Sequence, residues 1–386
     1  MASTDSRALI ETLVAFDTVS AKSNLALIQF LRGRLAAHGV EARLVHDETG
    51  KKANLYATIG PQDRPGVLLS GHSDVVPVEG QAWSSDPFTV LQKDGRLYGR
   101  GTADMKSFLA VAIAHVPAMV AANLKTPIHL AVSYDEEVGC IGVRRLLDVL
   151  NGLPVKPAMC IIGEPTGMRV VVGHKGKRAT RVRVRGLECH SSLAPQGVNA
   201  VDYAAELVVF LRRLARRQAA EGQHDGAYEV PVTTIHTGTI SGGTALNIVP
   251  KDCSFDFEIR NLPEEDPEPL VEEARRFARE ELEPEMHRVS TDCGIAFEPL
   301  SGYPGLDTDP GEEVVTFVKA LVGANEHGKI SFGTEGGLFQ TAAGIPSVVC
   351  GPGEIAQAHK PDEWIALDQV ALCERFMARL IARLSA

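Results

Sequence analysis

Imidazole and carboxylate side chains follow four apolar runs of this sequence, at or shortly after the points where those runs end. The runs are 67–71, 128–134, 159–163 and 347–350, and the side chains are His72, Asp74, Glu136, Glu137, Glu164 and His359. Runs of this length beside Gly and Pro are typical of buried strands. Because ligands of open α/β sheets bind at the carboxyl ends of strands, we expect these side chains to converge. Asp104, just before an apolar helical pattern at 105–120, is expected to join them.

These histidines and acids together predict a site for divalent metal ions. Imidazole and carboxylate without thiolate suit Zn²⁺, Co²⁺ or Mn²⁺. His72 and Asp74 are two residues apart and point to the same face, so one can ligate while the other supports the imidazole. Glu136 and Glu137 diverge in extended backbone, so one can bind metal while the other faces a substrate. A cation lowers the pKa of bound water toward about 7, and a neighbouring carboxylate can then act as a general base.

The alternative for any one of these acids is a solvated surface residue, which holds roughly nine times in ten. The histidines outside the set are expected to be surface or core residues: His38, His46, His115, His224 and His327. The recurrence of ligand types at strand ends, each in a glycine-rich context, favours the metal site. Because the chain has no H-E-x-x-H motif, the site is not that of a zincin.

The composition is that of a soluble globular protein with an acidic surplus. The 386 residues carry a net charge of -10, so neither nucleic acid nor an anionic membrane is expected as a partner. The seven cysteines are scattered and contain no C-x-x-C pair, which favours free thiols in a reducing cytoplasm. We expect no signal peptide at residues 1–6, and no apolar run approaches the roughly 20 residues that span a membrane.

Helical and strand patterns alternate from the start to about 176, which predicts a mostly parallel sheet covered on both faces. The expected helices and strands are 6–16, 24–38, 105–120 and 141–150, and 41–46 and 54–60 together with the runs above. The same character returns after about 290, with a helix at 312–322, a strand at 347–351 and a helix at 368–384. We therefore expect a discontinuous α/β catalytic domain at 1–176 and 290–386.

The segment 177–289 has a different pattern and is expected to be an inserted domain. Residues 181–185 alternate strictly, as in a strand with one solvated face. The remaining elements are expected as helices at 199–217 and 268–281 and strands at 233–240, 253–260 and 287–291. The order β-α-β-β-α-β is the split βαβ, ferredoxin-like pattern.

Five blocks of the sequence resemble, in order and along nearly the whole chain, the signature blocks of the M20 peptidase–deacetylase family. They are 71–77, 99–106, 135–139, 163–166, and 350–353 with 357–363. The resemblance implies a hydrolase with two zinc (or cobalt) ions and a cis peptide bond after the bridging Asp104. It assigns His72 and Glu164 to one metal and Glu137 and His359 to the other. Asp74 is implied to orient His72, and Glu136 to be the general base and proton shuttle.

The resemblance also makes the inserted domain a lid and dimerisation domain, so a homodimer is expected. His190, within 186–192, is implied to reach the partner subunit's active site and to stabilise the oxyanion, where a positioned donor is strongly favourable. Asn247 and Arg260 are implied to hold the substrate carboxylate, which an Arg can bind through two N–H groups. Without the resemblance, each of the three would be interpreted as an ordinary polar residue.

Within the family, the blocks 174–176, 190–192, 197–200 and 333–335 resemble enzymes that remove the acetyl group from N2-acetyl-L-ornithine. Ser107 and Gly336 with Gly337 depart from the usual form of that branch, which leaves the chemistry intact and bears on the substrate. The alternatives within the family are a succinyl-diaminopimelate desuccinylase, an aminoacylase or a carboxypeptidase-like dipeptidase. An amidohydrolase acting on a small N-acyl amino acid is common to all of them.

Two other classes are weaker alternatives. A nucleotide-dependent oxidoreductase would use the loose G-x-G-x-x-A at 351–356, but Pro352 and the lack of an immediate helical pattern make a poor phosphate loop. A metal-free binding relative would have lost ligands, whereas every expected ligand is present in this sequence.

Overall fold

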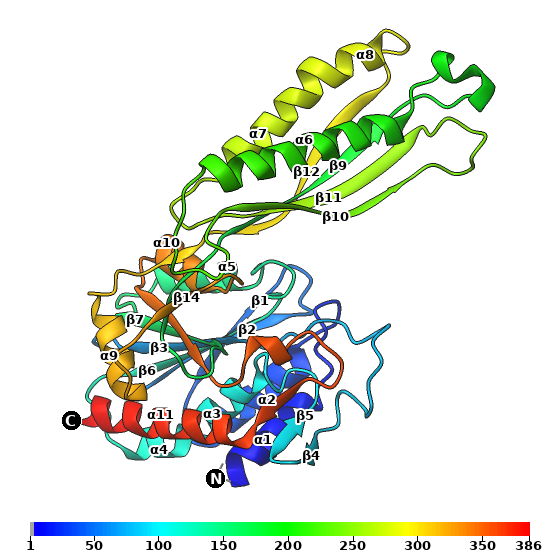
Figure 1. Ribbon diagram of the computed structural model, residues 1–386. Coiled ribbons are helices and arrows are strands. Elements are labelled where there is room, and N and C mark those ends of the chain that lie inside the picture. Colours follow the sequence, from blue (N-terminus) through cyan, green and yellow to red (C-terminus); the bar gives the residue numbers. More distant parts are fainter. Residues whose placement is uncertain (1–3) are drawn as a thin grey trace. The chain divides into compact units, whose positions relative to one another are not determined.

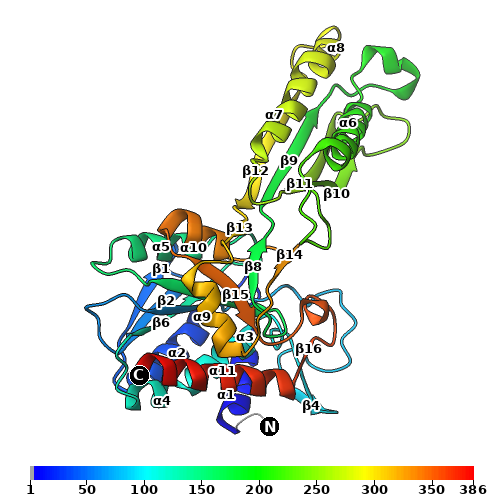
Figure 2. The ribbon, with the colours of Figure 1, turned by 60° about the vertical axis from the view of Figure 1, so that its left-hand side comes forward.

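The computed structural model describes residues 4–386, which form two compact units (Figures 1 and 2). The first unit contains the described residues up to His174 together with Leu306–Ala386, and the second unit is Lys175–Gly305. The second unit is therefore inserted into the sequence of the first. It ends at Gly305 rather than at 289, because its last strand extends to Tyr303.

A nine-stranded mixed sheet is the centre of the first unit. Its order is β1 (Ala42–His46), β2 (Ala53–Ile59), β6 (Ile128–Ser133), β3 (Val67–His72), β7 (Met159–Pro165), β15 (Ser347–Gly351), β8 (Val171–His174) and β13 (Leu306–Asp307), and β14 (Gly328–Ile330) also pairs with β8. The four strands from β6 to β15 are parallel, and the strands on both sides of them are antiparallel. β3 and β7 are buried along their whole length, which explains why they are continuous apolar runs. The predicted mixed, mostly parallel sheet is confirmed.

Helices cover both faces of this sheet (Figure 1). One face shares a core with α1 (Thr4–Val14), α2 (Leu25–Ala36), α3 (Lys106–Ala114), α4 (Val116–Ala121), α9 (Glu313–Val322) and α11 (Leu367–Ser385). On the other face, α5 (Val143–Asn151) and α10 (Gly336–Ala343) pack against each other and against the sheet. The single helix predicted at 105–120 is divided at His115, because Pro117, which has no backbone N–H to donate, lies in the first turn of a new helix that begins at Val116.

A small three-stranded sheet was not predicted from the sequence. It consists of β4 (Leu91–Lys93), β5 (Arg96–Tyr98) and β16 (Trp364–Ala366), with β5 in the middle. The strands are only three residues long, which is too short for a recognisable alternation. The sheet nevertheless joins the segment before Asp104 to the segment after His359.

The second unit contains β9 (Lys177–Arg185), α6 (Ala200–Glu221), β10 (Thr234–Gly242), β11 (Asp252–Arg260), α7 (Glu268–Phe277) and β12 (Gly294–Tyr303). Its antiparallel sheet has the order β10-β11-β9-β12, so the predicted ferredoxin-like arrangement is confirmed. The side chains on one face of the sheet, such as Val182 and Phe255, form a core with Leu207 of α6 and Val271 of α7. Figure 1 shows α6 and α7 running along this sheet.

The strand predicted at 287–291 is wrong. The helical segment after α7 continues through a π-helical turn, Ala278–Leu282, into α8 (Glu283–His287), and the strand begins only at Gly294. Ala278, Leu282 and Met286 recur every four residues and are all buried, so they belong to a helix face that packs on the sheet.

No helix within residues 4–386 has the length and apolar character needed to cross a membrane. All seven cysteines are free thiols; six of them are buried and Cys189 is partly exposed.

His129 of β6 is a buried imidazole that titrates in an unusual range. Its side chain is only 4% exposed, and its Nδ1 lies 2.8 Å from the Tyr56 hydroxyl oxygen and 3.0 Å from the Thr58 hydroxyl oxygen. Burial lowers the pKa of His129 from its usual 6.5 to about 4. The unfolded chain therefore binds a proton between these two values when the folded protein does not.

We expect the free energy of unfolding to fall as the pH falls from about 6.5 to about 4, by about 3 kcal/mol from this group. The sign follows because the folded-state pKa is the lower one, so protonation stabilises the unfolded chain. His129→Gln should reduce this pH dependence in urea-unfolding measurements. Above pH 7 the difference between the two proteins should be constant, because the imidazole is neutral in both states. An unchanged slope in the variant would contradict the assignment.

Candidate metal centre

Four of the five predicted ligands, all except Asp104, follow or end neighbouring parallel strands of the large sheet. β3 ends at His72, whose register partner on β6 is Ser133, and the acids at 135–137 follow directly. β7 lies on the other side of β3 and carries Glu164 near its end. β15 pairs with β7 and leads into the loop that carries His359. The parallel pairing of these strands is what gathers the side chains at one edge.

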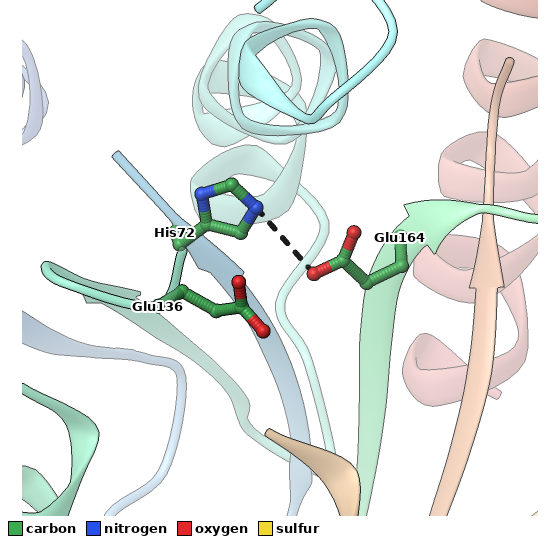
Figure 3. A group of neighbouring side chains, drawn as sticks. All are labelled: His72, Glu136 and Glu164. Carbon is green, nitrogen blue, oxygen red and sulfur yellow. Dashed lines mark ion pairs between the residues drawn. The ribbon is translucent and has the colours of Figure 1, made fainter. Parts of the chain in front are cut away.

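Two histidine–carboxylate groups share Asp104. His72 Nε2 lies 3.0 Å from Asp104 Oδ1 and 3.5 Å from Glu164 Oε1. His359 Nε2 lies 3.1 Å from Asp104 Oδ2 and 3.1 Å from Glu137 Oε2. Figure 3 shows the His72 imidazole directed at the Glu164 carboxylate, with Glu136 beside them. Because the two oxygens of Asp104 face different imidazoles, its carboxylate lies between the two groups.

These spacings fit a metal centre. Ligand atoms that each lie about 2.0–2.2 Å from a tetrahedral zinc ion are about 3.3–3.6 Å from one another. The nitrogen–oxygen separations in the two groups are 3.0–3.5 Å. In addition, ligand atoms of His72, Glu136 and Glu164, and of His72, Asp104 and Glu137, lie within 4.8 Å of one another. The donor set and its spacing therefore suit a pair of divalent cations.

Asp74 contacts both the imidazole of His72 and the backbone of the two glutamates. The Nδ1 of His72 lies 2.9 Å from the backbone oxygen of Asp74 and 3.6 Å from its carboxylate. The Asp74 carboxylate accepts the backbone N–H groups of Glu136 (3.1 Å) and Glu137 (3.3 Å), and the Ser20 hydroxyl donates to it at 2.7 Å. Asp74 thus links the end of β3 to the segment that carries both glutamates.

Glu136 lies beside the two groups without belonging to either histidine pair. The Cys140 thiol donates a hydrogen bond to its Oε1 at 3.3 Å. Burial, together with the charge of Glu137, raises the pKa of Glu136 to about 8, although the nearby His72 lowers it. A carboxylate with a raised pKa close to bound water is suited to accept and return a proton.

The electrostatics of the site reflect several acids in a buried space. Burial opposes the ionisation of Asp104, but hydrogen bonds from His359 and His72 hold its pKa well below the usual range. Burial and the charge of Asp104 raise the pKa of Glu137 to about 7. Hydrogen bonds to Asp104 and Glu137 raise the pKa of His359 to about 10. Positive charge is therefore strongly favoured between these groups.

The backbone around the site adopts uncommon conformations. The peptide bond between Asp104 and Met105 is cis, as the resemblance implies. Asp135, Cys140 and His359 have positive φ values of 55°, 54° and 61°. Such conformations in residues other than glycine cluster at active sites, where the surrounding structure holds them.

Sequence reasoning did not identify several polar neighbours of the site. Ser20 binds Asp74, and Cys140 binds Glu136, as described above. Glu335, just before α10, is 1% exposed and lies 3.5 Å from the Ser70 hydroxyl. Burial raises the pKa of Glu335 to about 7, although a hydrogen bond from the Ser133 hydroxyl lowers it. Glu335 lies in the block 333–335 (Gly-Thr-Glu), whose resemblance to the family was the available signal.

The other predicted residues belong to the second unit. His190 is exposed, and its Nδ1 accepts the backbone N–H of Ser192 at 3.2 Å. Asn247 is exposed, and its backbone oxygen accepts the N–H of Ser191. Arg260 is partly buried, where it pairs with Glu258 at 3.0 Å and with the Tyr303 hydroxyl at 2.8 Å.

The loose glycine motif at 351–356 does not form a phosphate loop. β15 leads into a 3₁₀ helix of three residues, Ile355–Gln357, rather than into an α-helix. A phosphate site of this type needs the N–H groups and dipole of a following α-helix. The nucleotide-dependent oxidoreductase is therefore not supported.

The fold and the site together define a metal-dependent amide hydrolase, and known proteins identify its family. Residues 68–383 match peptidase family M20/M25/M40, so the chain belongs to this family. It is 36% identical over 387 residues to acetylornithine deacetylase of Myxococcus xanthus, with 97% of this chain and 96% of that protein covered. It is 32% identical over 373 residues to acetylornithine deacetylase of Pasteurella multocida (strain Pm70), with 96% and 94% covered.

Solved structures share the fold along the whole chain. The M20 family metallo-carboxypeptidase Sso-CP2 from Sulfolobus solfataricus has a TM-score of 0.78 at 19% identity, covering 99% of both chains. The YXEP protein of Bacillus subtilis, a dinuclear metal binding peptidase from the M20 family, has a TM-score of 0.65 at 16% identity, covering 99% of this chain and 98% of its own.

Proposed function

We propose that this chain removes the acetyl group from N2-acetyl-L-ornithine, giving L-ornithine and acetate, a step of arginine biosynthesis. The observation that carries the proposal is the near full-length similarity, at 32–36% identity, to curated proteins that are named acetylornithine deacetylase. The complete set of histidines and acids around Asp104 supports an active enzyme. We further propose that the protein acts in the cytoplasm, consistent with its free thiols.

The proposed cofactor is a pair of Zn²⁺ or Co²⁺ ions. His72 and Glu164 would hold one ion, Glu137 and His359 the other, and Asp104 would bridge them, in keeping with the distances above. When bound, the ions would polarise the substrate carbonyl and lower the pKa of a water molecule. Asp74 would keep the His72 imidazole and the two glutamates in register.

Glu136 is proposed as the general base and proton shuttle. Its carboxylate would take a proton from the attacking water as the oxygen bonds to the acetyl carbon. It would then give that proton to the ornithine nitrogen as the C–N bond breaks. The Cys140 thiol, which donates to Oε1, would leave the other oxygen of Glu136 for this transfer.

His190 is proposed to donate a hydrogen bond to the carbonyl oxygen as negative charge develops there. Its Nδ1 accepts a backbone N–H, so in the neutral imidazole the proton is on Nε2 and that nitrogen is a donor. Asn247 and the N–H groups of Arg260 that Glu258 and Tyr303 do not occupy would bind the substrate carboxylate. We propose that His190 acts from the partner subunit of a homodimer formed through the inserted domain. We further propose that hinges where the chain passes between the two units, near 175 and 305, let this domain close as a lid.

The experiment that tests the substrate compares kcat/KM for N2-acetyl-L-ornithine, N-succinyl-diaminopimelate, other N-acetyl amino acids and a dipeptide, on enzyme loaded with Zn²⁺ or Co²⁺. We expect N2-acetyl-L-ornithine to be preferred by at least about tenfold, since a mismatch of roughly 1.4 kcal/mol in the transition state suffices for that ratio. Equal or faster turnover of another class would reject this substrate and retain the hydrolase.

A further inference from the structure

Three of the proposed ligands lie outside the strands of the large sheet: Glu137 comes shortly after β6, and Asp104 and His359 lie on longer loops. Asp104 lies in the loop 99–105, and His359 lies in the loop 358–363. β5 leads into the first loop and β16 follows the second, and these strands pair with Trp364 opposite Tyr98. The small sheet thus brings the loops together, but it ends before either ligand is reached. Other groups must hold the loops in register.

Glu363 is the centre of that connection. Its side chain is 1% exposed, and its Oε1 accepts three backbone N–H groups: Gly101 at 3.0 Å, Ala103 at 2.9 Å and Asp104 at 3.1 Å. Its own backbone oxygen accepts the N–H of Gly99 at 2.9 Å. One residue of the His359 loop therefore binds the Asp104 loop along most of its length.

Arg100, a residue of the Asp104 loop, binds the His359 loop in return. Its guanidinium is also buried, and its Nη1 donates to Glu363 Oε2 at 2.8 Å and to the backbone oxygen of Lys360 at 3.3 Å. The other side of the guanidinium donates to Gln81 and lies 5.0 Å from the centre of the Trp83 ring. Arg100 thus holds the residue that directly follows His359.

A buried carboxylate is required here because all the groups around it are donors. The three N–H groups converge on one oxygen and the guanidinium donates to the other, so both oxygens of the carboxylate act as acceptors. An amide in place of the carboxylate would turn its NH₂ group toward N–H groups or toward the guanidinium. A buried donor facing another donor is strongly unfavourable, so one of the two connections would open.

We propose that Glu363 and Arg100 are positioning residues that set the spacing between Asp104 and His359, and with it the affinity for the cation that these ligands share. In the hydrogen bonds above, Glu363 and Arg100 bind backbone groups of the two loops and each other. They do not bind the carboxylate of Asp104 or the imidazole of His359. The inference rests on the proposed ligand assignment but not on the identity of the acyl amino acid.

The test is Glu363→Gln, measured by titrating metal-free protein with Co²⁺ without substrate. We expect binding of one cation to weaken by about 10–100-fold, the usual effect of losing a group that orients ligands. The visible absorption of the bound Co²⁺ should also change, because it reports the coordination geometry. The matched control is Glu273→Gln, which makes the same chemical change in the Arg217–Glu273 pair of the second unit. It should leave both measurements as in the parent.

The outcomes separate this inference from the proposed function. A parent that binds no cation would reject the ligand assignment itself. A folded Glu363→Gln variant with the parent's Co²⁺ affinity and spectrum would overturn the positioning role alone. If circular dichroism shows that this variant is unfolded, Arg100→Lys decides instead. It keeps the charge but loses the planar fork, and about tenfold weaker binding with an altered spectrum is expected. Parent-like values in Arg100→Lys would then reject the proposal.

Discussion

Glu136→Gln should lower kcat by about 10²–10⁴-fold, the range that a positioned general base contributes, while two divalent metals remain bound. The amide has nearly the shape of the carboxylate but cannot accept and return the proton. Glu136 makes no ion pair with His72 or His359 within the described part of the chain, so the imidazole pairs should persist. Steady-state kinetics and metal content by mass spectrometry measure the two halves of the prediction.

The matched control for this variant is Asp135→Asn. Asp135 is the neighbouring acid, but its carboxylate is directed to Lys52 at 2.5 Å, and asparagine tolerates its positive φ. We expect kcat of this control to remain within the same order of magnitude as the parent. A Glu136→Gln enzyme with comparable turnover would refute the proton-shuttle role. Loss of the metals together with activity would instead make Glu136 a ligand.

Asp104→Asn should have the largest effect on metal binding, because both histidine groups depend on this carboxylate. Two opposite unit charges about 4 Å apart attract each other by about 4 kcal/mol at an effective dielectric constant near 20, and a divalent cation doubles this attraction, so the loss of affinity should be at least roughly a thousandfold. The two oxygens of Asp104 lie 3.0 Å from His72 and 3.1 Å from His359, so both cations should bind more weakly. Zn²⁺ affinity measured by competition with a chelating dye tests this expectation.

Asp307→Asn is the corresponding control. Asp307 lies on β13, where its carboxylate pairs with Lys329 at 3.0 Å and its side chain is 40% exposed. Its replacement should leave the Zn²⁺ affinity unchanged. If Asp104→Asn weakened only one of the two binding events, Asp104 would be a terminal ligand of a single cation rather than a bridge.

Much of the fold was predictable because burial leaves a local trace in the sequence. Strands buried on both faces, such as 67–72, must be apolar throughout, and helices that pack on a sheet repeat apolar residues every three or four positions. The same reasoning failed at 287–291, where the end of α8 and the turn that follows it were interpreted as a strand. It also missed β4, β5 and β16, whose three residues each carry too little pattern.

The types of chemistry-bearing residues were determined by the sequence alone. Histidines and acids that follow apolar runs indicate a metal site at a sheet edge, because strand ends are where the chain can expose ligands. The inserted domain and its strand order were also accessible, since alternation of side chains is a local property.

Only the tertiary structure decided how those residues are held. That Asp104 faces His72 with one oxygen and His359 with the other depends on loops that lie far apart in the sequence and come together only in the folded protein. That Asp74 binds the backbone of Glu136, and Glu363 that of Gly101, depends on contacts between segments 62 and 262 positions apart. Backbone N–H groups are the same in every residue except proline, so no side-chain pattern could have indicated which carboxylate would bind them.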